Sequence, residues 1–64
     1  MIIHSTITED RLLKVIQSDE PIGFCIECGA DNWGVEPDAR EYECDECGCS
    51  AVFGAEEILF HFIG

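Results

Sequence analysis

Four cysteines in this chain have the types and the spacing of a metal site. They occur in two copies of the phrase Cys-x2-Cys-Gly, and fifteen residues separate Cys28 of the first copy from Cys44 of the second. This spacing is typical of a zinc site, because four thiolates so placed can converge on one tetrahedral ion. We therefore predict one Zn²⁺ per chain, and the predicted ligands are Cys25, Cys28, Cys44 and Cys47.

A glycine, Gly29 or Gly48, follows the second cysteine of each phrase. Glycine adopts a positive φ without a Cβ penalty, so the backbone can turn tightly there and direct its N–H groups at the sulfurs. We call each Cys-x2-Cys-Gly turn a knuckle. An all-sulfur tetrahedral site has no open position, so we expect zinc to be structural here and not catalytic. Tetrahedral sulfur also suits iron, and an iron site is the alternative.

The remaining residues that bear reactive groups form no catalytic pattern. The acidic pairs are expected to be solvated, since no nucleophile with a positioned base accompanies them. We therefore predict no catalytic residues, no cofactor-binding residues other than the metal ligands, and no enzyme activity. Cys49 is expected to be a free, buried or half-buried thiol, and His4 and His61 to be ordinary surface or packing residues.

The length of 64 residues predicts a single domain, 1–64, whose own core is marginal. A structural zinc can stabilise such a chain, since its apparent binding free energy is about 10–16 kcal/mol. We divide the domain into an N-terminal helix region, 1–19, a metal-binding region, 22–54, and an apolar C-terminal segment, 55–64.

The charge is strongly acidic, with 14 Asp and Glu against 3 Lys and Arg and a formal net charge of −11. Nucleic-acid binding requires clustered basic side chains, so direct nucleic-acid binding is not expected. The sequence shows neither a secretory signal nor a membrane span. Five cysteines without an export signal favour reduced thiols on a metal, and we expect a cytoplasmic protein.

The first element is predicted to be a helix that begins with a capping box, with Thr6 as N-cap and Glu9 at the third helical position. Its apolar residues form a stripe that must pack on other parts of the chain. The helix is expected to end near Ser18, because Pro21 follows shortly afterwards.

The metal-binding region is predicted to form a three-stranded ribbon. Its three strands are expected at 33–35, 41–43 and 51–53, and a short strand at 22–24 leads into the first knuckle. A turn at 37–39 is expected to join 33–35 and 41–43 as a β-hairpin between the knuckles. Segment 51–53 is the return strand.

The apolar C-terminal segment, 55–64, matches both a short helix and a strand. We expect it to pack on the N-terminal helix or on a second copy of the protein. Between the knuckles, Tyr42 is expected to pack near the metal site. Trp33 either packs there or serves as an interface anchor.

At the cysteines the sequence resembles a zinc ribbon, in which two such knuckles share one zinc. The resemblance covers roughly residues 22–54 and implies the fold and the four ligands, but no particular function. With segments 34–40 and 54–57 added, the chain is similar to small acidic zinc-ribbon proteins of bacteria and their phages. It also resembles rubredoxins, although Asp45 stands where they usually have proline and the segment between the knuckles is shorter here.

These observations lead to three hypotheses on function. The first is a structural-zinc module whose acidic surface engages a basic surface of a protein partner as an adaptor or inhibitor, in one form as a nucleic-acid mimic. The second is a rubredoxin-like iron electron carrier. The third is a structural zinc-ribbon domain that forms a homodimer through the C-terminal segment.

Overall fold

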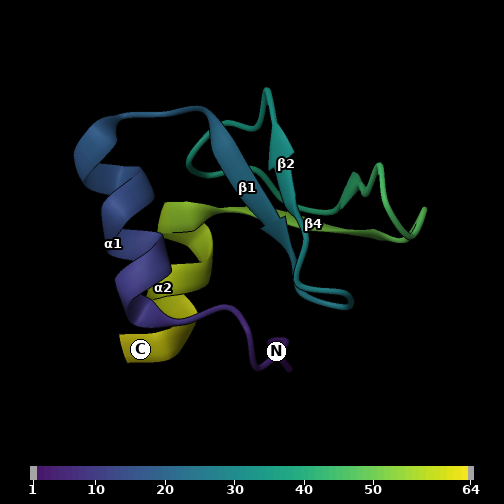
Figure 1. Cartoon of the computed structure of the whole chain (residues 1–64), viewed down its shortest axis with the longest axis horizontal. Helices are drawn as coiled ribbons and strands as arrows, with labels where there is room; N and C mark the ends of the chain where they lie inside the picture. Colours follow the sequence, from purple (N-terminus) through teal and green to yellow (C-terminus); the bar gives the residue numbers. More distant parts are fainter. Residues whose placement is uncertain (1, 64) are drawn as a thin grey trace.

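The chain folds into two helices and a small antiparallel sheet, as seen in a computed structural model that describes residues 2–63. The helices lie side by side at one end of the molecule, and the sheet extends from them (Figure 1). The predicted C-terminal segment ends at Gly64, which lies outside the described residues. The elements in order are α1 (Glu9–Ser18), β1 (Ile22–Cys25), β2 (Asp31–Trp33), β3 (Tyr42–Glu43), β4 (Ser50–Gly54) and α2 (Ala55–Ile63).

The sheet has four strands in the order β2-β1-β4-β3, so the prediction of three strands was wrong. The two longest strands, β1 and β4, pair at its centre, with Phe24 opposite Phe53 and Cys25 opposite Val52. The short strands β2 and β3 lie at the two edges. Segment 22–24 is therefore part of a central strand of the sheet and not merely a lead into the first knuckle.

The predicted hairpin between the knuckles does not form, because β2 and β3 lie at opposite edges of the sheet. Each knuckle itself acts as the hairpin turn: β1 pairs with β2 across the first, and β3 pairs with β4 across the second. Strand β2 also ends at Trp33 and does not run over 33–35, since Gly34 has a φ of 76°. The turn at Pro37 and Asp38 instead belongs to a connection that crosses from one edge to the other.

Helix α1 begins two residues later than predicted, with its N-cap at position 8 and not at position 6. Its N-cap is Thr8, whose side chain accepts a hydrogen bond from the backbone N–H of Arg11, so the assignment of Thr6 as N-cap was wrong. Thr6 instead contacts the ring of His4. The helix ends at Ser18 as predicted, and Asp19 caps it in the left-handed conformation with a φ of 57°.

The C-terminal segment is helical over Ala55–Ile63, which resolves the choice between helix and strand. Helix α2 packs on α1, and the two helices share one apolar core with β1. Leu12 and Ile58 are both fully buried in this core. Its buried members are Ile7, Leu12, Ile22, Phe24, Ala55 and Ile58.

A second core lies beneath the knuckles. Its centre is Val52 on β4, which is fully buried. Two of the predicted ligands belong to this core, whose buried members are Cys25, Val35, Ala39, Cys44, Ala51 and Val52. Within residues 2–63, neither helix has the length and apolarity that crossing a bilayer requires.

Candidate metal centre

The structure brings the four predicted ligands together at the end of the sheet that carries both knuckles. Cys25 is the last residue of β1, and Cys44 directly follows β3. Both are buried, whereas Cys28 is half-buried and Cys47 is exposed. Both knuckles close with the same hydrogen bond, from the glycine N–H to the carbonyl of the first cysteine, at 2.8 Å in one and 2.9 Å in the other.

The four sulfurs have the spacing of a tetrahedral metal site. All four lie within 4.8 Å of one another. The Cys25 and Cys47 sulfurs are 3.6 Å apart, as are those of Cys28 and Cys44. A zinc–sulfur distance of about 2.3 Å gives tetrahedral sulfur–sulfur edges of about 3.8 Å, and a disulfide bond is only about 2.05 Å long. The residues therefore fit a metal ion such as zinc, and all five cysteines of the chain are free thiols.

The knuckle glycines adopt the predicted conformation. Gly29 has a φ of 81° and Gly48 a φ of 77°. The turn that precedes Gly48 directs the backbone N–H of Glu46 at the Cys44 sulfur, 3.3 Å away. Such N–H groups supply partial positive charge to a thiolate and stabilise it.

The protein environment gives these thiols different pKa values. The N–H of Cys47, opposed by burial and aided by the N–H of Glu46, lowers the pKa of Cys44 to about 6. The N–H of Ala30 lowers the pKa of Cys28, but burial and the neighbouring thiols outweigh it and raise that pKa to about 12. Burial likewise raises the pKa of Cys25. One thiol thus ionises readily, and a bound cation would favour ionisation of the others.

Asn32 is a residue of the site that the sequence analysis missed. It lies in the middle of β2, and only 5% of its surface is exposed. Its side-chain N–H₂ donates to the Cys44 sulfur at 3.7 Å, and its side-chain oxygen accepts from the N–H of Asp45 at 3.0 Å. The stretch Ala30-Asp31-Asn32 is typical of a turn and by itself gives no indication of a strand. A strand beginning at Asp31 would have placed Asp31 and Trp33 on one face and Asn32 alone on the other, facing inward.

The other candidate ligands stay outside the four-sulfur cluster. Cys49 is exposed, so the expectation of a buried or half-buried thiol was wrong. Its carbonyl accepts from the N–H of Cys44 at 2.8 Å, which closes the second knuckle. His4 is half-buried against the first knuckle, and His61 is exposed on α2.

Neither aromatic residue between the knuckles packs over the metal site. Trp33 is 65% exposed, which removes the packing alternative. Tyr42 is 41% exposed, so the expectation that it packs was wrong. Its hydroxyl donates to the Glu36 carboxylate, and this bond lowers the pKa of Glu36 and raises the pKa of Tyr42. Tyr42 is thus held at the edge of the sheet by a hydrogen bond to Glu36 and is not buried there.

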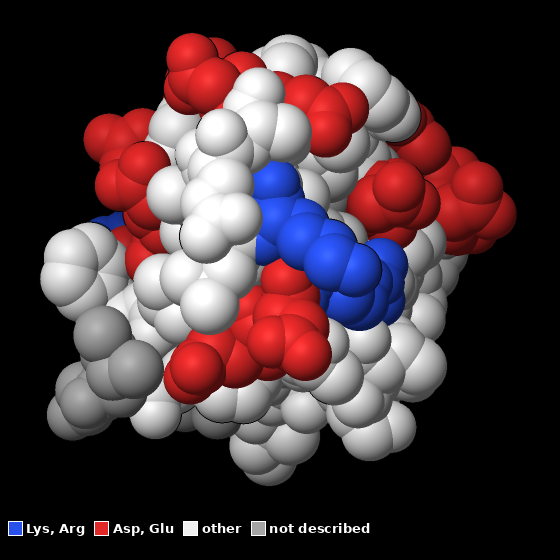
Figure 2. Space-filling model, turned by 60° about the vertical axis from the view of Figure 1, so that its left-hand side comes forward, with Lys and Arg blue, Asp and Glu red and all other residues white. Residues whose placement is uncertain are grey.

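Thirteen of the 14 acidic residues are exposed, and Glu57 is the buried one. Glu57 forms an ion pair with Arg40. On the face that Figure 2 shows, acidic side chains lie above, below and to the right of a basic patch, and a second basic group is visible at the left edge. Eight of the exposed acids lie between residues 27 and 46: Glu27, Asp31, Glu36, Asp38, Glu41, Glu43, Asp45 and Glu46.

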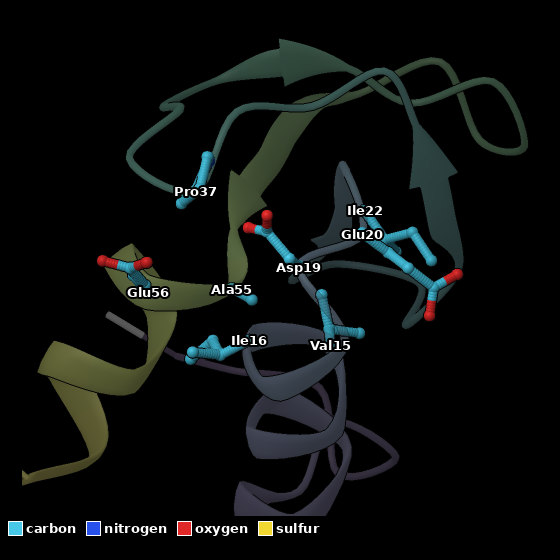
Figure 3. A pocket seen from close by; sticks show the side chains of 8 residues that line it. All are labelled: Val15, Ile16, Asp19, Glu20, Ile22, Pro37, Ala55 and Glu56. Atoms are coloured by element: carbon cyan, nitrogen blue, oxygen red, sulfur yellow. The ribbon is translucent and has the colours of Figure 1, made fainter.

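A cavity of about 20 Å³ lies where the end of α1 meets the start of α2 (Figure 3). This volume holds about one water molecule. Two wider, shallow hollows of about 350 Å³ each open on the surface. One lies between the helices beside Phe60, and the other lies beside Val35. The residues that line the small cavity are Val15, Ile16, Asp19, Glu20, Ile22, Pro37, Ala55 and Glu56.

Comparison with known proteins adds no relative: no family model, no curated protein and no solved structure matches the chain. The site and the surface of this chain are therefore the features that bear on its function.

Proposed function

We propose that this protein is a zinc-ribbon-like module in the cytoplasm, in which one structural Zn²⁺ fixes a small acidic domain that binds a basic surface of a protein partner. The partner is engaged without catalysis, as by an adaptor or inhibitor, and the acidic surface acts as a mimic of nucleic acid if that partner handles nucleic acid. The protein itself binds no nucleic acid directly.

The observation that carries the metal half of this proposal is the convergence of four free sulfurs with a spacing close to that of a zinc tetrahedron. Cys25, Cys28, Cys44 and Cys47 would hold the ion. Four protein ligands leave no coordination position for a substrate, so the ion would supply stability and no reaction chemistry. Because a chain of this length has a marginal core, that stability matters for folding.

Native mass spectrometry together with elemental analysis of the purified chain tests the metal half. We expect one zinc per chain, and replacement of Cys25 by Ser to abolish tight binding. The exposed Cys49 provides the matched control, since Cys49→Ser should retain one zinc. A red protein that contains iron would favour the electron-carrier alternative over the zinc module, because tetrahedral sulfur sites suit both metals. A chain that binds neither metal would contradict the proposal.

The partner half is supported by the hollow beside Val35, which we call the acidic hollow and which has about 350 Å³ of volume. Its apolar part would accommodate the alkyl stem of a lysine or arginine, and its carboxylates would pair with the charged head. Trp33 directly precedes Gly34 in the chain and is exposed, and an exposed aromatic face of this kind attracts cations. The residues that line the hollow are Asp19, Glu20, Pro21, Gly34, Val35, Glu36 and Pro37.

A pair of charge-matched variants tests the partner half. Asp19→Asn with Glu20→Gln removes two charges from the acidic hollow, and Glu43→Gln with Glu46→Gln removes two exposed charges elsewhere. We expect a partner retained from lysate at low salt to be released at raised salt, because exposed charge pairs are screened. Loss of retention should be larger for the hollow variant. Retention that is indifferent to salt would contradict the electrostatic proposal, and equal loss in both variants would contradict the assignment of the acidic hollow as the binding site.

A homodimer is the second candidate function, and the exposed aromatic residues of α2 favour it. Phe60 is 65% exposed and Phe62 is 43% exposed. Phe60 also borders the other shallow hollow, with Ile16 and Leu59. Sedimentation of the wild type and of Phe60→Ala distinguishes the cases: a dimer that the substitution dissociates supports this candidate, and a wild-type monomer at working concentration removes it.

A further inference from the structure

Asn32 joins the two halves of the metal site. It lies on β2, which leads out of the first knuckle, yet both of its contacts across the site are to the second knuckle. The backbone between Asn32 and Cys44 leaves one edge of the sheet and returns at the other. Backbone pairing between β2 and β3 is therefore absent, and the Asn32 side chain provides a direct link in its place.

We propose that Asn32 is a positioning residue of the metal centre, which orients Cys44 and thereby sets the affinity for the ion and its rate of release. This inference rests on the proposed function, because it assumes that the four cysteines hold a metal. Asn32 itself would not touch the ion.

The two bonds of the carboxamide have different roles. The bond from Asp45 N–H to the Asn32 oxygen, at 3.0 Å, fixes the backbone just after Cys44. The N–H₂ group, 3.7 Å from the Cys44 sulfur, supplies a donor to the thiolate. The N–H₂ group also donates to the Ala30 carbonyl at 3.4 Å, which holds the carboxamide in the orientation that points nitrogen at sulfur. The amide meets both needs with separate atoms, since its oxygen accepts from Asp45 while its nitrogen donates to Cys44.

Two substitutions separate these roles. Asn32→Asp keeps the shape and the acceptor for the Asp45 N–H, but it removes the donor and places a carboxylate beside the sulfur. Asn32→Leu removes both bonds at similar volume. Loss of a partner that orients a metal ligand typically weakens metal binding by about 10–100-fold. We expect Asn32→Asp to fall in this range, with a faster release of Zn²⁺ to a chelator.

The matched control is Gln17→Glu, which makes the same change from amide to carboxylate on the exposed surface of α1. It should leave zinc affinity unchanged. A second readout is the reduction potential of the iron-substituted protein, because hydrogen bonds to the sulfurs set that potential. Asn32→Asp should lower the potential, because it removes a donor to the sulfur and adds a negative charge beside it, and Gln17→Glu should not. Asn32→Leu removes the donor without adding a charge and should also lower the potential, whereas an unaltered potential in Asn32→Leu would contradict the role of the N–H₂ group at the sulfur.

The outcomes are distinct. If wild-type protein binds one zinc tightly and Asn32→Asp has the same affinity, release rate and potential, the inference on Asn32 fails while the metal site stands. If wild-type protein binds no metal, both fail together. If Asn32→Leu does not fold, Asn32→Asp still decides the matter, because it preserves the bond to the Asp45 N–H.

Discussion

The two knuckle glycines form a matched pair whose substitution by alanine measures how the N-terminal segment packs on the first knuckle. Gly29 and Gly48 have nearly the same φ, 81° and 77°, and the same backbone hydrogen bond. Their surroundings differ. A Cβ on Gly48 would meet nothing within 4 Å, whereas a Cβ on Gly29 would clash with the Thr6 hydroxyl and lie 2.7 Å from the His4 ring nitrogen.

The expected costs follow from this difference. Gly48→Ala should lower the free energy of unfolding by about 1–2 kcal/mol, the cost of a left-handed residue that has a Cβ. Gly29→Ala carries the same cost and also displaces the side chains of His4 and Thr6. Their two hydrogen bonds, at 2.9 Å and 3.2 Å, would break at about 0.5–1.5 kcal/mol each. We therefore expect Gly29→Ala to cost about 1–3 kcal/mol more than Gly48→Ala.

Urea unfolding at a fixed, saturating zinc concentration measures both variants, since bound metal adds to apparent stability. Each glycine variant is also made in a protein that carries His4→Ala and Thr6→Ala, which completes a double-mutant cycle. In that background the two glycine substitutions should cost the same. Equal costs in the wild-type background would refute the reasoning, because they would show that His4 and Thr6 do not pack tightly on the knuckle.

Three further predictions concern the core, the sheet edge and the metal. Ile58 is fully buried, and Ile58→Ala should lower the free energy of unfolding by about 2–5 kcal/mol. Phe60 is exposed, and Phe60→Ala should change that free energy by no more than about 0.5 kcal/mol. Urea unfolding measures both variants. Because the Glu36 bond raises the pKa of Tyr42 above 10.0, Glu36→Gln should move the tyrosinate absorbance titration to lower pH. An unmoved titration would contradict that bond. Chelation of the metal should abolish the cooperative thermal transition, and re-addition of Zn²⁺ should restore it; a transition that survives chelation would show that zinc does not stabilise the fold.

The convergence of the cysteines could be predicted because its signal is local. The spacing within each Cys-x2-Cys phrase and the glycine that follows it determine a tight turn, and these turns appear where the sequence placed them. The end of α1 at Ser18 has a similarly local cause in the nearby proline. Such features depend on a few consecutive residues, so they form in the same way whichever strands pair.

The pairing of the strands could not be predicted from the same residues. Strands β2 and β3 have three residues and two, too few for a pattern to identify their partners. The turn signal at Pro37 was strong enough to suggest a hairpin, but the knuckles provide competing turns that bring β1 to β2 and β3 to β4. Asn32 was missed for the same reason, since its inward orientation depends on where β2 begins.

The arrangement of the sheet explains why one ion would organise so small a protein. Each knuckle closes a hairpin at the end of one central strand, and the pairing of β1 with β4 sets the two knuckles side by side. The helical end has an apolar core of its own, but the core beneath the knuckles includes Cys25 and Cys44. Four thiolates held this close repel one another unless a cation lies between them. A metal ion would thus bind the two knuckles together, and the exposed acids on the knuckles and edge strands would be held in fixed positions.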